Sequence, residues 1–236
     1  MTLVADMLDP MTRTLAGITP ATPAPLVTFY DVATSERTEL SGTTMANWVA
    51  KVSNFLVDDL DVEVGTRIRL GLPAHWLRFV WLLSSWNVGA VVADHDCEIG
   101  LTGPDLNATE SIKLASALAP FGMRFPTAPD GFLDIGIEVL GHPDHYEPFA
   151  IPSETDLAWD LAGTTSTHES ALATLTSAAN RLLLADTDIL TDARALISAI
   201  NSGGSLVSVR NASQDAIATI AHQENAEIYH VGDEIV

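Results

Sequence analysis

Positive charge is scarce in this sequence of 236 residues. Lys51 and Lys113 are the only lysines, and lysine and arginine together number 11, against 31 aspartates and glutamates. The resulting net charge of −20 would repel the phosphates of nucleic acids and of anionic lipids, so we expect neither nucleic acid nor a membrane as a partner. Free ATP is disfavoured for the same reason, unless a local positive site overrides the field.

Cysteine and long apolar segments are also lacking. Cys97 is the only cysteine, so an intramolecular disulfide is excluded, as is usual in a reducing cytoplasm. No segment reaches the roughly 20 apolar residues of a membrane-spanning helix. The first residues, MTLVADMLDP, have no basic flank followed by a long apolar run, so we expect no signal peptide. Together these absences predict a cytoplasmic protein.

Apolar residues, in contrast, are plentiful enough for a full core. They make up 47% of the sequence, and a chain of this length buries about 70–75% of its unfolded surface. We expect one unit over residues 1–236, with two subdomains at about 26–150 and 151–236. Residues 1–25 are expected to be an N-terminal extension and a linker, because the segment TPATPAP is rich in proline.

Strand and helix patterns alternate through the first part of the chain. We expect strands at 26–30, 37–40, 67–72 and 90–93, and helices at 41–56 and 76–86. Ser41 is expected to cap the first helix rather than to bind phosphate. The short links predict parallel strands with right-handed crossovers, and therefore an α/β fold with a mainly parallel central sheet and helices on both faces. Trp81 lies off the apolar stripe of its helix, so we expect it to be exposed or to meet a partner.

The pattern is weaker in the middle of the chain and regular again near its end. A short helix is also expected at residues 1–9, before Pro10. From residue 109 onward the expected elements are a helix at 109–118, a short element at 132–140 within an otherwise irregular stretch, a strand at 157–161, a helix starting near Thr167, a helix capped by Asp192 and ended by Gly203-Gly204, a strand at 205–209, a helix capped by Ser213, and a strand at 227–231.

Three stretches of the sequence carry recognisable motifs, namely ELSGTTMANWVAKVSNFLVDDLDVEVGTRIRLGLP (39–73), HWLRFVWLLSSWNVGAVVADHD (75–96) and DLAWDLAGTTSTHESALATL (156–175). Together they resemble the N-terminal part of the adenylate-forming superfamily, which includes acyl-CoA synthetases, firefly luciferase and peptide-synthetase adenylation domains. The first stretch is similar to the family's opening strand, helix and strand, the second is similar to the helix and strand that follow, and the third lies where the family has its phosphate loop. The resemblance implies the fold of the family's N-terminal subdomains, and it is nearest to a small bacterial group of shortened, degenerate members.

The phosphate loop of the intact family holds nucleotide phosphates with glycine amides, hydroxyl groups and a lysine. The resemblance therefore implies a degenerate nucleotide-cofactor site at three residues, Gly163, Thr164 and Thr165. Ser166 replaces the second glycine, and the lysine position falls near Glu169 or Ser170. Ser166 and Glu169 also fit a capping box, which would place a carboxylate at the positive end of a helix. We expect His168 between them to be a surface histidine.

Two further clusters carry side chains that could bind metal, but neither predicts a metal site. In Asp94-His95-Asp96-Cys97-Glu98, successive side chains on an extended chain point to alternate sides, and no second cluster with zinc spacing accompanies them. His142 and His145 are three residues apart, but Pro143 favours a loop. The acidic neighbours of Cys97 also argue against a reactive thiolate.

In the family, later segments supply the adenine pocket, the ribose-binding aspartate and a mobile lid with the catalytic lysine, and the sequence ends at Val236 before any segment that resembles them. We therefore expect a shortened, non-catalytic homologue without a cofactor, which acts as a small-molecule-binding or regulatory module. Its ligand would bind beyond the carboxyl ends of the strands. Two alternatives stay open: an enzyme of altered chemistry with a nucleotide site near Gly163–Thr165, and a structural subunit that docks on another protein or on itself.

Overall fold

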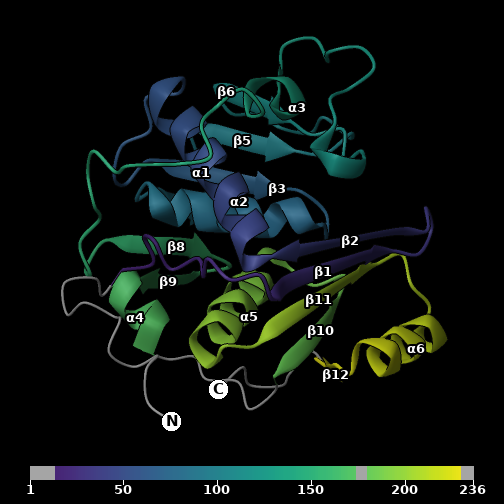
Figure 1. Cartoon of the computed structure of the whole chain (residues 1–236). Helices are drawn as coiled ribbons and strands as arrows, with labels where there is room; N and C mark the ends of the chain where they lie inside the picture. Colours follow the sequence, from purple (N-terminus) through teal and green to yellow (C-terminus); the bar gives the residue numbers. More distant parts are fainter. Residues whose placement is uncertain (1–13, 174–179, 230–236) are drawn as a thin grey trace.

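The computed structural model describes residues 14–173 and 180–229, so the helix expected at 1–9 lies outside the described residues. Two sheets enclose a layer of helices (Figure 1). One sheet has five strands in the order β12-β10-β11-β1-β2, and the other has seven in the order β7-β6-β5-β3-β4-β8-β9. The α/β class with mainly parallel strands is confirmed, but the single central sheet expected from the sequence is replaced by two.

The five-stranded sheet joins the two ends of the described chain. Its strands are β1 (Pro25–Asp31), β2 (Glu36–Ser41), β10 (Arg181–Ala185), β11 (Ser205–Arg210) and β12 (Glu227–Ile228). β1 pairs antiparallel with β2, as the expected hairpin, and parallel with β11. β10 runs parallel to both of its neighbours, β11 and β12.

The seven-stranded sheet is parallel except at one edge. Its strands are β3 (Arg67–Gly71), β4 (Val91–Ala93), β5 (Ile99–Thr102), β6 (Ile112–Ala115), β7 (Leu133–Asp134), β8 (Leu157–Leu161) and β9 (Thr164–Thr167). Only β8 and β9 pair antiparallel. The helix expected at 109–118 was wrong, because this short apolar stretch forms β6 against β5; tertiary pairing decides such ambiguous runs. Neither sheet is confined to one side of residue 150.

Three long helices form the layer between the sheets, namely α1 (Gly42–Asp58), α2 (Trp76–Asn87) and α5 (Ile189–Ser202). α6 (Gln214–Glu224) covers the outer face of the five-stranded sheet, where Ile217 and Ile220 pack on Leu183, Val207 and Val209. Two short helices, α3 (Ile135–Glu138) and α4 (His168–Ala173), and a single 3₁₀ turn at Pro120–Gly122 complete the helical elements of the described residues.

Several helix ends follow their local sequence signals. Ser41 caps α1, with the Thr44 amide donating to its hydroxyl at 3.1 Å, and Ser213 caps α6 in the same way. Gly203 ends α5 in the left-handed region, with φ 68°. The cap of α5, however, is Asp188 and not Asp192, because the Asp192 carboxylate is used elsewhere.

α2 is buried on every side because both sheets and two helices surround it. All residues from Trp76 to Trp86 are buried, and Trp81 is 0% exposed, so the expectation that Trp81 would be exposed was wrong. Burial extends even to Arg78, whose guanidinium pairs with the carboxylate of Asp192 on α5 and donates to the Thr187 carbonyl at 2.8 Å. This ion pair joins α2 to α5, the helix that packs on β10 and β11 of the five-stranded sheet.

No helix within residues 14–173 and 180–229 combines the length and the apolar character that crossing a membrane requires.

Candidate functional site

The residues of the expected phosphate loop form the turn of a β-hairpin and the strand after it. Leu161 ends β8, Thr164 begins β9, and the two residues pair across the ladder. Ala162 and Gly163 between them both have positive φ, 51° and 72°, as a two-residue type I′ turn requires. Thr164 and Thr165 lie on β9 with their side chains exposed, so the loop does not open directly onto a helix.

The helix α4 begins only after β9, which separates it from the turn. The amide of Ser170 donates to the Thr167 hydroxyl at 3.2 Å, so Thr167 caps α4. The capping box expected for Ser166 and Glu169 was wrong, because Ser166 is still paired with Trp159 in the sheet. Four extended residues span about 13 Å, which removes Glu169 from the neighbourhood of the turn.

His168 is a core residue and not the surface histidine that the sequence indicated. It is 0% exposed, and its Nδ1 accepts a hydrogen bond from the Leu15 amide at 3.0 Å. Burial lowers the pKa of His168 to about 4, so the ring is neutral at pH 7. A neutral ring that accepts this bond fastens the N-terminal segment to the fold and offers no positive charge to an anion.

The acidic stretch at 94–98 supplies the carboxylate that lies beside the turn. Asp94 follows β4, and its Oδ2 accepts from the Ala162 amide at 2.8 Å, while its Oδ1 lies 2.7 Å from His95 Nδ1. Arg67 on β3 donates to the Asp160 carboxylate at 2.9 Å and to the His95 carbonyl at 3.1 Å. The structure thus brings together two stretches that the sequence analysis treated separately.

These contacts place the negative charge of Asp94 on a backbone amide of the turn. The hydrogen bond from His95 makes the largest contribution to lowering the pKa of Asp94, and the hydrogen bond from the Ala162 amide lowers it further. The same bond between the two side chains raises the pKa of His95. A phosphate that approached the Ala162 amide would therefore have to displace a bound carboxylate. The carboxylate that contacts the turn therefore belongs to Asp94.

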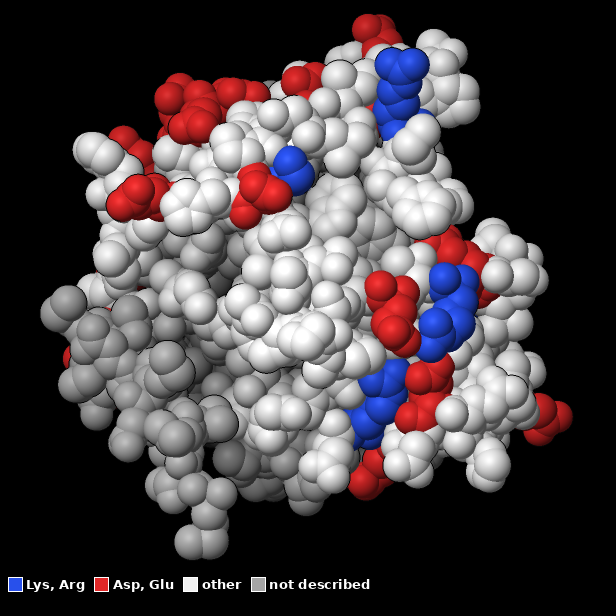
Figure 2. Space-filling model, viewed as in Figure 1, with Lys and Arg blue, Asp and Glu red and all other residues white. Residues whose placement is uncertain are grey.

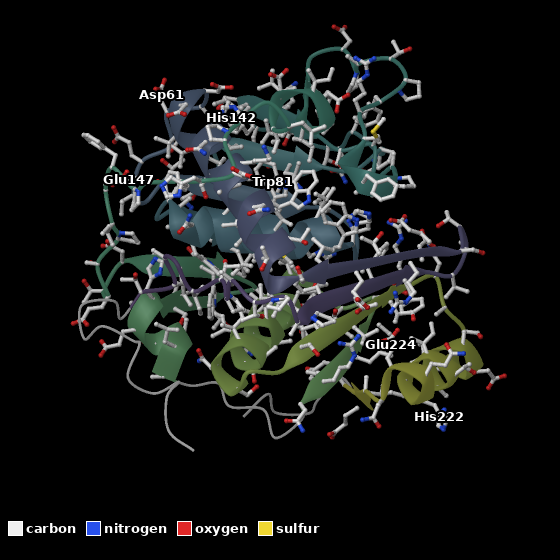
Figure 3. The ribbon with its side chains drawn as sticks, in the orientation of Figure 1. Asp61, Trp81, His142, Glu147, His222 and Glu224 are labelled. Carbon is white, nitrogen blue, oxygen red and sulfur yellow. The ribbon has the colours of Figure 1, made fainter. Side chains whose placement is uncertain are left out.

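Neither metal-capable cluster forms a metal centre within the described part of the chain, where no group of three or more His, Cys, Asp or Glu could hold an ion. The thiol of Cys97 donates to the Ala93 and His95 carbonyls, and burial raises its pKa to about 11. His142, labelled in Figure 3, lies 3.2 Å from the Asp59 carboxylate, and its carbonyl accepts from Lys51. Asn54 on α1 also donates to the His145 carbonyl at 3.0 Å, so the loop that carries both histidines is held against α1.

A groove of about 690 Å³ lies at the carboxyl ends of β1 and β11, between the five-stranded sheet and the segment that follows β6. We call it the inter-sheet groove. Its lining combines apolar and polar side chains from β1, β2, α1, α2, β11 and the 118–121 segment, among them Asp31, Glu36, Thr38, Leu40, Thr44, Trp48, Trp76, Leu118, Phe121 and Arg210. The outline of the molecule is indented on the right at this level, with acidic and basic side chains along the lower side (Figure 2).

Aromatic rings shape the floor and the rim of the groove. Trp48 and Trp76 meet edge to face with ring centroids 5.3 Å apart. Gly122 has φ 67°, and a Cβ added there would lie 2.8 Å from the Trp48 ring, so only glycine fits beside it. Phe121 on the rim is 82% exposed and has φ 60°, a conformation that costs a bulky residue on the order of 1 kcal/mol.

Ion pairs neutralise most of the charge in the groove. Arg210 pairs with the carboxylate of Asp31, which also accepts from Asn211 at 2.9 Å. Burial alone would raise the pKa of Asp31, but the bonds from Asn211 and Arg210 hold it at about 2. Arg37 pairs with Glu39 at 2.9 Å. A ligand was expected beyond the carboxyl ends of the strands, but the residues that line the groove were not identified from the sequence, because six separate segments contribute them.

No model of a known protein family matches the sequence. Among solved structures, an acyl-CoA synthetase of Brucella canis is similar with a TM-score of 0.71 at 14% identity, over 91% of this chain and 46% of that one. The N-terminal domain of FACL13 from Mycobacterium tuberculosis is similar with a TM-score of 0.66 at 12% identity, over 86% of this chain and 57% of that one. At such identities these likenesses show the fold alone.

The fold is therefore that of the N-terminal part of acyl-CoA synthetases, as the resemblance predicted, and the chain spans about half the length of these solved structures. A protein of Mycobacterium tuberculosis (strain ATCC 25618 / H37Rv) described as a TIGR03089 family protein is 34% identical over 233 residues. That similarity covers 89% of this chain and 90% of the relative. With identity at this level over most of both proteins, the present chain belongs to the TIGR03089 family.

Proposed function

We propose that this chain is a non-catalytic, small-molecule-binding module built on an acyl-CoA synthetase fold, and that its ligand binds in the inter-sheet groove. The contrast between two places supports the proposal. The groove has a volume of about 690 Å³, within the usual range of ligand pockets, and mixes aromatic with polar walls. The turn at Gly163 carries a carboxylate of the protein itself, on the Ala162 amide.

The positions of the two lysines also argue against phosphate chemistry at the turn. Lys51 donates to the His142 carbonyl, and Lys113 on β6 lies 5.6 Å from the centre of the Phe132 ring. β6 is four strands away from β8 in the sheet, which is about 19 Å at the usual strand spacing. A phosphate at the turn would therefore lack the point charge that a lysine supplies.

The test uses nuclear magnetic resonance of the protein labelled with nitrogen-15, and it follows two signals. These are the Trp48 indole N–H, assigned by its loss in Trp48→Phe, and the Gly163 backbone amide. Benzyl alcohol, a small neutral aromatic probe, is expected to shift the Trp48 signal in a saturable way. Magnesium ATP, AMP and coenzyme A are expected to leave the Gly163 signal unchanged. Saturable shifts at Gly163 with a Trp48 signal that ignores benzyl alcohol would overturn the proposal.

An enzyme of altered chemistry is the second candidate, and the exposed hydroxyl-bearing residues at the turn favour it. Thr164 and Thr165 face solvent, and nothing lies within 4 Å of the position of a Cβ on Gly163. A nucleotide could therefore approach the turn sterically if Asp94 moved. Release of pyrophosphate from magnesium ATP, with an added fatty acid or water as the nucleophile that attacks the α-phosphorus, is measured with an Asp94→Asn variant beside the natural protein and decides between the two. Release by either protein supports the enzyme.

A structural subunit is the third candidate, favoured by apolar side chains that face solvent. Phe149 is 98% exposed and Ile151 is 60% exposed, in the segment before β8. Apolar residues exposed together are a usual sign of an association surface. Light scattering tests self-association directly: a mass above one chain that falls in Phe149→Ser would support this candidate, and a strict monomer would argue against docking of the chain on itself.

A further inference from the structure

We propose that the inter-sheet groove selects an organic cation, a ligand with a small alkylammonium head, over neutral and anionic molecules of the same shape. This inference rests on the proposed function, because it names the class of ligand for the same groove. Two independent features of the groove support it: a carboxylate that has no cationic partner among the described residues, and aromatic rings in the same lining. The strong negative charge of the whole chain adds to both.

The unmatched charge belongs to Glu36 on β2. Asp31 pairs with Arg210, and Glu39 pairs with Arg37, so these two carboxylates are neutralised by their neighbours. Glu36 instead accepts a hydrogen bond from the Thr38 hydroxyl at 3.0 Å, and no cationic side chain of the described residues lies within ion-pair distance of it. The groove therefore carries one net negative charge from partly buried Glu36.

Aromatic rings complete a surface suited to a cation. Trp48 is partly exposed in the floor, and Phe121 stands on the rim, where its left-handed backbone holds it away from the core. The electron-rich faces of such rings attract ammonium groups, and Trp does so best. Backbone strain at an exposed apolar residue is typical of ligand clamps. Glu36 lines the same groove, so its negative charge would attract an alkylammonium group that these rings hold.

The two arginines of the groove are the strongest argument for an anion instead, and their contacts weaken it. Arg210 lies against the Phe29 ring as well as the Asp31 carboxylate, and its Nε is buried. Arg37 is shared between Glu39, Glu224 and the Tyr30 hydroxyl. An anionic ligand near either arginine would meet a carboxylate that already holds the same guanidinium. The net charge of −20 would also repel it and attract a cation.

Three probes of one shape and different charge test the inference. Choline is the cation, 3,3-dimethylbutan-1-ol is the neutral isostere, and 3,3-dimethylbutanoate is the anion. The affinity of each is measured from the shift of the Trp48 indole N–H signal in the intact chain. Choline is expected to bind about tenfold more tightly than the neutral isostere, because cation–π and ionic contacts act together. The anion is expected to bind more weakly than both.

Three variants assign the effect to the groove, and the first two are a matched pair. Glu36→Gln is expected to remove most of the preference for choline and to leave the neutral isostere unchanged. Glu147→Gln removes one exposed carboxylate on the opposite side of the molecule from the β1–β2 hairpin (Figure 3), so it is expected to change neither affinity. Phe121→Ala should weaken choline binding through the lost ring, with the fold intact because the ring is exposed.

The outcomes separate this inference from the proposed function. If benzyl alcohol and the neutral isostere bind but choline has no advantage, the preference for a cation is refuted while the binding groove stands. Tighter binding of 3,3-dimethylbutanoate would refute it in favour of an anion at the arginines. If no probe shifts the Trp48 signal, both proposals are wrong. A choline preference that survives in Glu36→Gln would also overturn the inference, because the charge would then act from elsewhere.

Discussion

Single residues connect the two sheets through the helices between them. Arg78 on α2 and Asp192 on α5 form the buried pair, with side chains 8% and 1% exposed. Arg78 also donates to the carbonyls of Leu72 and Thr187, so its charge is enclosed by partners from three segments. Such a pair contributes little net stability when complete, but it becomes costly when one partner is removed.

We expect Asp192→Ala to lower the free energy of unfolding by about 3–5 kcal/mol, because it leaves the buried Arg78 charge without its carboxylate. Asp188→Ala, four residues earlier, is the matched control. It removes the cap of the same helix and should cost about 1 kcal/mol. Urea unfolding of the two variants checks the difference, and equal losses would show that the ion pair has no special role.

His168 predicts a dependence of stability on pH. Its pKa falls from 6.5 in a free histidine to about 4 in the fold, because burial disfavours the charged ring despite the attraction of Asp156. The unfolded chain therefore binds a proton that the folded chain does not, and stability is lost as pH falls below 6.5. Between about pH 7.5 and 5.5 this one residue should account for roughly 1 kcal/mol.

His168→Gln tests this prediction, because glutamine still offers an acceptor to the Leu15 amide but does not titrate. Urea unfolding at the two pH values should show a smaller loss of stability in the variant than in the natural chain. His75 is also buried with a pKa of about 3, mainly because burial disfavours its charge, so the variant should keep part of the pH dependence. An unchanged slope in His168→Gln would contradict the assignment.

Residue environments were the hardest feature to infer from the sequence. Ser41 and Ser213 were recognised as caps, because a cap depends on residues only three positions away. Trp81 and His168 were misjudged because their burial depends on a second sheet and on the N-terminal segment, which are distant in sequence. The partner of Asp192 lies 114 residues away, so local spacing made it look like a cap.

At the scale of elements, the β8–β9 hairpin is the feature that the sequence concealed. A two-residue type I′ turn favours Asn-Gly, whereas this turn is Ala162-Gly163. Without asparagine the segment showed no hairpin signal, and its resemblance to a phosphate loop decided the interpretation. The expected strands at 26–30, 67–72 and 157–161 were confirmed, because each is a compact apolar run with clear breaks.

The turn gives a prediction at this scale. Ala162 pays a steric penalty for its positive φ of 51°, which asparagine tolerates better. We expect Ala162→Asn to raise the free energy of unfolding by about 0.5–1 kcal/mol, and Ala162→Val, which introduces a β-branched residue, to lower it by about 1 kcal/mol or more. Thermal unfolding of both variants measures the effect. Stabilisation by valine would mean that the turn has another conformation.

For the whole molecule, the dominant property is the excess of negative charge. The net charge of −20 on 236 residues makes the compact state repel itself. Added sodium chloride screens this repulsion over a distance of about 10 Å at 0.1 M. We therefore expect the urea midpoint to rise as salt is raised from a few millimolar to physiological strength. Potassium chloride at the same ionic strength should give the same rise, because screening depends on ionic strength. A midpoint that fell with salt would show that ion pairs such as Arg67–Asp160 outweigh the repulsion.

The overall class of fold followed from the sequence, but its division into two sheets did not. Alternating strands and helices predicted parallel pairing, which holds in both sheets. Nothing in the order of the elements indicated that β1 would pair with β11 as well as with β2, because about three-quarters of the chain separates β1 from β11. The groove was equally hidden, since its lining comes from the five-stranded sheet, from α1 and α2, and from the segment that follows β6.

The pairing of β1 with β11 has a consequence for biosynthesis. Val27 lies opposite Leu206, so the first hairpin emerges from the ribosome long before the strand that completes its sheet. At typical translation speeds of about 5–20 residues per second, that delay is on the order of ten to thirty seconds. During this time the edge of β1 that will bind β11 is unpaired, and an unpaired strand edge is where a nascent chain is most prone to aggregate.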